Sequence, residues 1–335
     1  MTNSSGELKP TLGLVGITIN AMALIAPGAF LWTTYQLQAP SDSAKNMWAA
    51  IALSTCIALL TASCYATLSK AYPDAGAGSS YFYAEAAILA KEEHKHFRLA
   101  RLVKFVTGWA AHLYYWVYPG IMVSFMGTLV VYIGQLFNPD FGSDWLSKTL
   151  ICFAFAGLIG AIALMGVTGS TLINIIINIV QIASLTFLGL LMIVYRLGHP
   201  NVNYEHANVL SVIVPHDLMG LIYQATIAIL LLVGFESATA MAGEAINPQR
   251  DIPRGVILSL FIQACVCYFF EYFAANFFIG DQYTATVDGK TVTGFAAALS
   301  SGAPIGDIAK ILGDTLLFGN GFLLQLMMAG TVVMA

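Results

Sequence analysis

Charged residues are scarce in this chain. Asp, Glu, Lys and Arg make up only 10% of its 335 residues, whereas 58% are hydrophobic. Soluble domains carry roughly a quarter charged residues, and a soluble core cannot hide so large an apolar fraction. The composition therefore excludes an ordinary soluble domain and predicts that lipid solvates much of the surface. The formal net charge of −4 gives no reason to expect a nucleic-acid partner.

Sequence motifs of catalysis are also lacking. We find no phosphate-binding loop, no nucleophile elbow and no zinc-binding helix motif. The five cysteines all lie inside apolar runs, where they are interpreted as small hydrophobic residues rather than metal ligands. We therefore expect no enzyme activity, no cofactor and no metal site. A cleavable signal peptide is not evident either, so the first span is expected to act as an uncleaved insertion signal.

Long uncharged runs predict about eight transmembrane helices, because a bilayer core of roughly 30 Å needs about 20 helical residues. The run Thr149–Tyr195 is long enough for two helices joined by a turn at Gly166–Gly169. The run Phe105–Leu136 contains Pro119-Gly120, where we expect a kink. The remaining predicted spans are Leu12–Ala39, Met47–Ser69, Leu218–Gly243, Arg254–Ile279 and Thr315–Ala335.

Basic residues predict how these spans are oriented. Nine of the 14 Lys and Arg residues lie in the N-terminus and the even-numbered connections, and five lie in the odd-numbered ones. The positive-inside rule then places the N-terminus in the cytoplasm of a multi-pass protein of the inner or plasma membrane. The last apolar run ends without flanking basic or aromatic residues, so we expect the natural protein to continue beyond it.

Span one carries Pro27-Gly28 near its middle. Both residues disfavour a helix interior, and freed backbone groups at this depth are tolerated only inside protein or beside a wet cavity. One interpretation is an ordinary proline kink. The other is a discontinuous helix whose exposed N–H groups bind an anionic ligand group.

Two carboxylates lie inside apolar helices. Glu236 follows Gly234-Phe235 in span six, and Glu271 is expected near the outer end of span seven, where a side chain snorkels to water more easily. A charge at such a depth must be neutralised, paired or facing water. Each carboxylate is therefore either a structural, protonated side chain or a candidate for proton coupling. Interruptions in spans one and six, five helices apart, are the pattern of an inverted-repeat transporter with a midplane site.

The residues around Glu236 resemble a known family. Gly234-Phe235-Glu236, followed by the stretch Gly243–Arg254 (GEAINPQRDIPR), resembles the amino acid–polyamine–organocation (APC) permease superfamily. Weaker similarities are the loop Tyr72–Tyr81 after span two and Gly108-Trp109 at the start of span three. The resemblance covers nearly the whole chain. It implies an all-α membrane protein with the APC/LeuT-type five-plus-five inverted-repeat fold, truncated after about eight transmembrane helices.

The resemblance also implies an organisation and a site. Residues 1–11 would form a cytoplasmic tail, 12–196 the first repeat and 217–335 an incomplete second repeat. The break in helix one would bind the substrate carboxylate, and the break in helix six would bind the amine through backbone carbonyls. Departures from the family pattern are Ala26 and Pro27 in the first break, Leu230 at an aromatic gate position and Ser184 where some members carry a lysine. The implied substrate-binding residues are Ile25, Ala26, Gly28, Ala29, Val233, Gly234, Phe235 and Glu236.

The sequence therefore predicts a secondary active transporter of amino acids or related amines that works by alternating access. It would be an antiporter or a proton symporter, with H⁺ or Na⁺ as the coupling ion and the lipid bilayer as its surroundings. The main alternative is a non-transporting membrane receptor or sensor on the same fold. An integral membrane enzyme would need converging catalytic groups, and the sequence offers only isolated carboxylates. A chain that lacks its last helices could also be inert.

Overall fold

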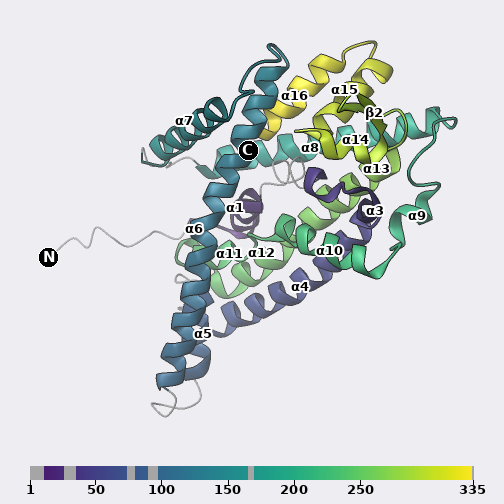
Figure 1. Ribbon diagram of the computed structural model, residues 1–335. Helices are drawn as coiled ribbons and strands as arrows, with labels where there is room; N and C mark the ends of the chain where they lie inside the picture. The colour runs from purple at the N-terminus through teal and green to yellow at the C-terminus, as the bar shows by residue number, and fades with distance from the viewer. Residues whose placement is uncertain (1–10, 26–34, 74–79, 90–96, 165–169, 334–335) are drawn as a thin grey trace. The chain divides into compact units, whose positions relative to one another are not determined.

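The computed structural model describes residues 11–25, 35–73, 80–89, 97–164 and 170–333. This part of the chain is mainly helical (Figure 1). It divides into two compact units, and each unit draws on both halves of the sequence. Unit 1 comprises residues 1–25, 57–120 and 233–261, and unit 2 comprises residues 26–56, 121–232 and 262–335.

Several predicted spans are confirmed as long apolar helices. Four described helices are long and apolar enough to cross a bilayer, and shorter apolar helices accompany them. Together with a hydrophobic surface, they make this chain an α-helical, multi-pass membrane protein. The four long helices are Met47–Ala71, Ile175–Gly198, Leu218–Glu244 and Pro248–Phe278.

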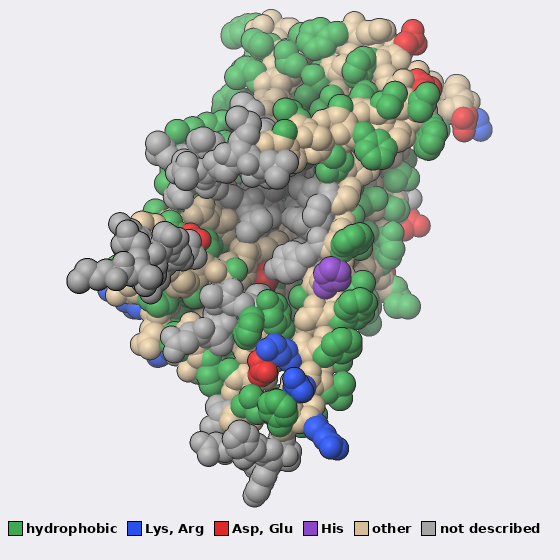
Figure 2. Space-filling model, turned by 90° about the vertical axis from the view of Figure 1, so that its left-hand side faces the viewer, with side chains coloured by type: hydrophobic (Ala, Val, Ile, Leu, Met, Phe, Trp, Pro, Cys, Tyr) green, Lys and Arg blue, Asp and Glu red, His purple; other side chains and the backbone are tan. Residues whose placement is uncertain are grey.

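The surface of the molecule is rich in exposed hydrophobic side chains. Figure 2 shows them spread over much of the face in view, with few charged groups among them. On helix α6 (Phe97–Gln135), for example, Phe105 is 67% and Trp116 is 75% exposed. Apolar surface of this extent is unfavourable in water but favourable against lipid acyl chains.

Unit 1 is built around the first helix of the chain. The chain pairs at Leu12 with Ala245 in a parallel bridge, and the Leu12 carbonyl accepts a hydrogen bond from Ile246 N at 2.9 Å. Ile17 packs so closely on Gly255 that a Cβ there would lie 2.7 Å from its methyl group. The helices of unit 1 are α1 (Leu14–Ile25), the later part of α4 (Met47–Ala71), α5 (Ser80–Leu89), the first part of α6, α11 (Ser237–Ala240) and most of α12 (Pro248–Ile262).

Unit 2 holds most of the remaining helices and a β-hairpin. Strands β1 (Thr284–Val287) and β2 (Lys290–Thr293) pair antiparallel through a turn at Asp288-Gly289. Helices α15 (Pro304–Leu316) and α16 (Gly321–Val333) lie side by side in Figure 1. The other helices that lie wholly in unit 2 are α3 (Ser41–Ala44), α7 (Trp145–Leu164), α8 (Ser170–Gly198), α9 (Val209–Ile213), α10 (Leu218–Ala228), α13 (Phe270–Phe278) and α14 (Gly294–Ser300).

Span seven differs from its prediction. The sequence places its start at Arg254, after Pro253, but the helix begins at Pro248. The Asn247 carbonyl accepts hydrogen bonds from the backbone N–H groups of Arg250 and Asp251, at 3.1 and 2.8 Å, and so begins the first turn. Pro253 therefore lies inside the helix, beyond its first turn, where it cannot donate the usual hydrogen bond to the carbonyl four residues before it. The span also contains a π-helical segment, Gln263–Phe269, between α12 and α13.

Other spans also depart from their predicted limits. Helix α6 begins eight residues before the predicted Phe105, and its helical structure continues through Pro119-Gly120. The last span begins at Gly321 rather than Thr315, because α15 ends at Leu316 and the chain then turns through Phe318 and Gly319, both with positive φ. The predicted turn at 166–169 lies outside the described residues.

Candidate functional site

Span six is interrupted around Gly234. Helix α10 passes into a 3₁₀ turn, Ile229–Leu232, and helical structure resumes at Ser237 in α11. Between them Gly234 has a φ of 126°. Residues with a Cβ atom rarely adopt this backbone conformation, so a glycine is needed for the chain to take this route.

Side chains within the interruption satisfy its backbone groups. The Gly234 N–H donates to Oε2 of Glu236 at 2.9 Å. The Gly234 carbonyl accepts from the Ser237 hydroxyl at 2.6 Å and from the Ser237 N–H at 3.1 Å. The Glu236 carbonyl accepts from the Thr239 hydroxyl at 2.7 Å. A ligand amine at either carbonyl would therefore compete with a hydroxyl group of the protein itself.

Tyr65 of α4 lies against the same interruption. Its ring meets the ring of buried Phe235 edge-on, with centroids 6.3 Å apart and planes at 85°. Its hydroxyl group hydrogen-bonds with the Ser80 side chain and lies in the neighbourhood of Glu236. Sequence reasoning missed both Tyr65 and Ser237. Ser237 directly follows Gly234-Phe235-Glu236 and could have been found from that position, whereas no local signal points to Tyr65.

Helix α1 runs toward this interruption. It packs against α11. The pairing of Leu12 with Ala245 joins the start of α1 to the chain just after α11. The two helices therefore run antiparallel, and Ile25, the last residue of α1, lies at the same end of the pair as Glu236. Three predicted site residues of span one, Ala26, Gly28 and Ala29, lie outside the described residues.

Glu271 occupies a different environment from Glu236. It lies on α13 with 1% of its surface exposed, and neither carboxylate oxygen has a hydrogen-bond partner among the described residues. A Cβ at Gly189 of α8 would lie 2.9 Å from its Oε1 atom. The carboxylate is thus enclosed against the backbone of α8, and the expectation that the side chain snorkels to water is wrong. Glu236, by contrast, is half-buried.

Buried amide side chains form a further polar cluster in unit 2. Gln224 of α10 donates to the Gln38 carbonyl at 2.6 Å and to the Ser43 hydroxyl at 2.9 Å. The Tyr272 hydroxyl donates to the Gln38 side-chain oxygen. The Tyr35 hydroxyl donates to the Asn276 side chain at 3.2 Å. These contacts join spans one, six and seven through groups that carry no charge, which is why the sequence analysis did not single them out.

Metal binding finds no support in the described ranges. Within them no three His, Cys, Asp or Glu side chains gather as ligands for a metal ion.

Comparison with known proteins places the chain in a family. The family model described as "Amino acid permease" matches residues 11–334. Among curated proteins, the chain is 26% identical over 273 residues to cationic amino acid transporter 1 of Arabidopsis thaliana, which covers 79% of this chain and 42% of that protein.

Two bacterial proteins are similar to a comparable degree. The branched-chain amino acid permease BcaP of Bacillus subtilis is 23% identical over 78% of this chain and 53% of its own length. The low-affinity putrescine importer PlaP of Escherichia coli K12 is 25% identical over 81% of this chain and 55% of its own. The chain thus spans about half the length of the curated relatives it matches.

Proposed function

Because the chain belongs to the amino acid permease family, we propose that it carries amino acids or related amines across a membrane as a secondary active transporter. The observation that carries this proposal is the interruption at Gly234, with the half-buried Glu236 carboxylate folded onto it. A broken membrane helix with a carboxylate beside it is a site at which a small cationic group can replace the protein's own hydrogen bonds. The proposal concerns transport and not catalysis.

The names of the relatives favour an amine as the common feature of the substrate. They name cationic amino acids, branched-chain amino acids and putrescine. These compounds share an amino group, whereas putrescine has no carboxylate. We therefore assign the amine to Glu236 and to the carbonyl groups near Gly234, with Val233 and Phe235 as the adjoining walls. A substrate carboxylate, where present, would bind at Ile25–Ala29.

The proposed mechanism is alternating access around interrupted helices one and six. It uses two inverted repeats, residues 12–196 and 217–335, of which the second is incomplete. Support comes from the places where the chain passes between the two compact units. One of them follows Leu232, at the end of the 3₁₀ turn in span six, and another follows Ile25, just before the predicted break at Pro27-Gly28. Irregular helix segments are where a rocking bundle can bend.

For the coupling ion we propose H⁺, bound at Glu271. Its carboxylate is enclosed and has no donor or cation near it in the described part of the chain, so a bound proton is the simplest way to neutralise it. Na⁺ would need several oxygen ligands around one point. Glu236 remains the second candidate for proton coupling, since it could exchange a proton for a substrate amine. We further propose the cell membrane as the location, with a cytoplasmic N-terminus.

Substrate binding to the purified chain tests the site directly. We expect Glu236→Gln to weaken binding of radiolabelled lysine or putrescine about tenfold or more, because a charge-assisted hydrogen bond contributes roughly 1.5–3 kcal/mol. Glu244→Gln is the matched control, since Glu244 lies eight residues further along the same segment and is exposed. Equal binding by wild type and Glu236→Gln would remove the proposed role of this carboxylate.

Uptake into proteoliposomes tests transport itself. Accumulation of a radiolabelled amino acid or amine that depends on a proton gradient, and that Glu271→Gln abolishes, would support the proposed coupling. Accumulation driven only by a Na⁺ gradient would contradict it. Binding with no flux of any amino acid or amine under either gradient would instead favour a membrane sensor.

A further inference from the structure

Arg196 lies on the last turn of α8 and is held in one position by neutral groups. Its Nη1 atom donates to the Phe277 carbonyl at 3.1 Å, and Nη2 donates to the His206 and Ala207 carbonyls at 2.9 and 3.1 Å. The guanidinium also lies over the rings of Tyr204 and Phe277, 3.6 and 4.4 Å from their centroids. These contacts fix where its charge sits.

Among the described residues, no carboxylate pairs with Arg196. All three hydrogen-bond acceptors are carbonyl groups, and the ion pairs of the described residues, Lys45–Glu205 and Lys104–Glu85, do not include it. A guanidinium has five N–H donors, so the three bonds it makes leave two donors for another group. An anion would satisfy both the remaining donors and the charge.

A cavity of about 480 Å³ opens beside this guanidinium. Its polar lining comes from Arg196, Asn203 and Tyr204, and its apolar lining includes Leu197, Val202 and Phe277. None of the described residues that line it is acidic. The cavity therefore combines one fixed cation with apolar walls, which fits an anionic group attached to an apolar body.

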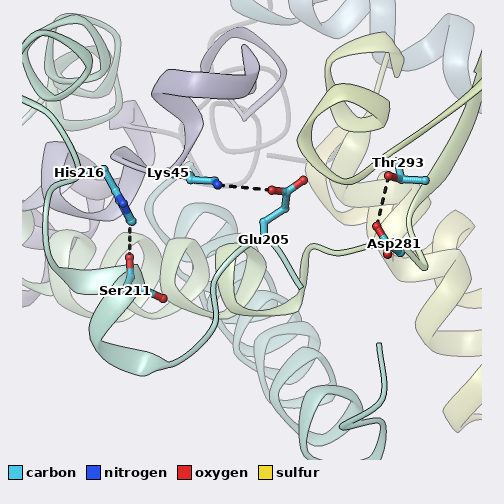
Figure 3. A network of polar contacts seen from close by, with 6 residues as sticks. All are labelled: Lys45, Glu205, Ser211, His216, Asp281 and Thr293. Carbon is cyan, nitrogen blue, oxygen red and sulfur yellow. Dashed lines mark hydrogen bonds and ion pairs between the residues drawn. The ribbon is translucent and has the colours of Figure 1, made fainter. Parts of the chain in front are cut away.

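The cavity lies at the end of an apolar span. The apolar span that contains Arg196 ends at Gly198. Leu197 is 72% exposed and Leu210, in the following connection, is 68% exposed, so both can contact lipid. Figure 3 shows that this connection is fastened by the Lys45–Glu205 ion pair, at 3.9 Å, and by the contact of the His216 ring with the Ser211 carbonyl, at 2.8 Å. These contacts hold the connection that lines the cavity, and a span that ends at Gly198 is expected to place it near the lipid headgroups.

We propose that this cavity binds the phosphate group of a membrane phospholipid, with Arg196 as its cation. The phosphate oxygens accept hydrogen bonds from the two remaining N–H groups of Arg196. Asn203 lies in the same lining. The apolar walls contact the glycerol and the first acyl carbons. The proposal does not depend on the transport function, because none of these residues belongs to the interruption at Gly234.

Lipid binding to the purified, delipidated chain tests this site. Native mass spectrometry would follow titration with dioleoyl phosphatidylglycerol. The variant Ala207→Asp adds a carboxylate to the lining. It does not remove the backbone carbonyl groups that accept hydrogen bonds from Arg196. We expect it to weaken binding of the first lipid about tenfold. Asn201→Asp is the control, because it adds the same charge to an exposed position of the same connection outside the lining.

Arg196→Gln should lose the same lipid, and its melting temperature would show whether it folds. The proposal would be overturned if Ala207→Asp bound phosphatidylglycerol as tightly as wild type, or if dioleoylglycerol, which has no phosphate, bound equally well. Binding of orthophosphate alone, with no gain from the acyl chains of phosphatidylglycerol, would also overturn it in favour of a free-anion site.

Discussion

Glu236 and Glu271 are identical side chains in membrane helices, but their surroundings give the two carboxylates different burial and different hydrogen-bond partners. Glu236 is half-buried and accepts a hydrogen bond from the Gly234 N–H within its own segment. Glu271 is enclosed and has no such donor among the described residues. Sequence reasoning identified both residues because a carboxylate stands out in an apolar run. It could not separate their roles, since the contacts come from other elements.

Tyr65 offers a test of how the interruption is supported at the level of one residue. In Tyr65→Phe the ring remains against Phe235 and only the hydroxyl group near Glu236 is lost. We expect amine binding to weaken severalfold with little change in melting temperature, because one hydrogen-bonding group contributes about 1 kcal/mol. Radioligand binding and thermal unfolding would measure the two effects.

Two further variants complete this test. Tyr65→Ala also removes the aromatic pair, which is worth roughly 0.5–1.5 kcal/mol beyond its buried area, so its melting temperature should fall. If Tyr65→Phe were to bind the amine as wild type does, the hydroxyl group would have no positioning role.

At the scale of the element, the interruption of span six depends on one backbone conformation. Gly234 has a φ of 126°, and its two backbone groups are bonded to Glu236 and Ser237. Helix propensity alone does not predict this break, because the residues before it are good helix formers. The prediction came from the glycine and the carboxylate together, and it needed the family resemblance to reach the right residues.

Gly234→Ala should therefore damage the element more than an ordinary glycine substitution does. A Cβ at this φ costs about 1–3 kcal/mol, and relief of that strain would move the Glu236 carboxylate. We expect both a lower melting temperature and weaker amine binding. Gly243→Ala is the matched control, because nothing lies within 4 Å of a Cβ added there. Equal effects of the two substitutions would show that the backbone conformation at Gly234 is not required.

The ease of prediction varied from element to element. The predicted span Met47–Ser69 and helix α4 (Met47–Ala71) agree almost fully, because a long apolar run in this chain can only be a helix. The hairpin of β1 and β2 was missed, although Asp288-Gly289 is a recognisable turn signal. The uncharged cluster around Gln38 could not have been found, because single amides do not change hydropathy and their partners lie far away in sequence.

At the scale of the whole molecule, the polar connections between spans also influence stability. His206 lies in the connection after α8, is 1% exposed, and has no hydrogen-bond partner for either ring nitrogen among the described residues. Burial lowers the pKa of His206 to about 4; nearby His216, Lys45 and Arg196 act in the same direction, and the Ser211 backbone opposes them. The neutral ring is thus the form that suits the folded state.

This lowered pKa predicts how stability depends on acidity. An unfolded histidine has a pKa of about 6.5, so the unfolded chain binds the proton more readily than the folded chain. The stabilising effect of neutral His206 is complete above about pH 6.5 and is lost as the pH falls toward about 4. Thermal unfolding should show a steeper loss of melting temperature between these values for wild type than for His206→Gln. The exposed His112, replaced by Gln, provides the control, and parallel curves for wild type and His206→Gln would contradict the prediction.

The π-helical segment Gln263–Phe269 has a consequence for how the length of this chain can vary. A π-turn holds one residue more than an α-turn over nearly the same path, so the helices on either side keep their facing directions despite the surplus residue. Loss of one residue from this segment would restore a plain helix and leave Glu271 against α8. The same loss within α12 would turn every later side chain by about 100°. Among related sequences, span seven is accordingly the place where we expect a single insertion or deletion to be tolerated.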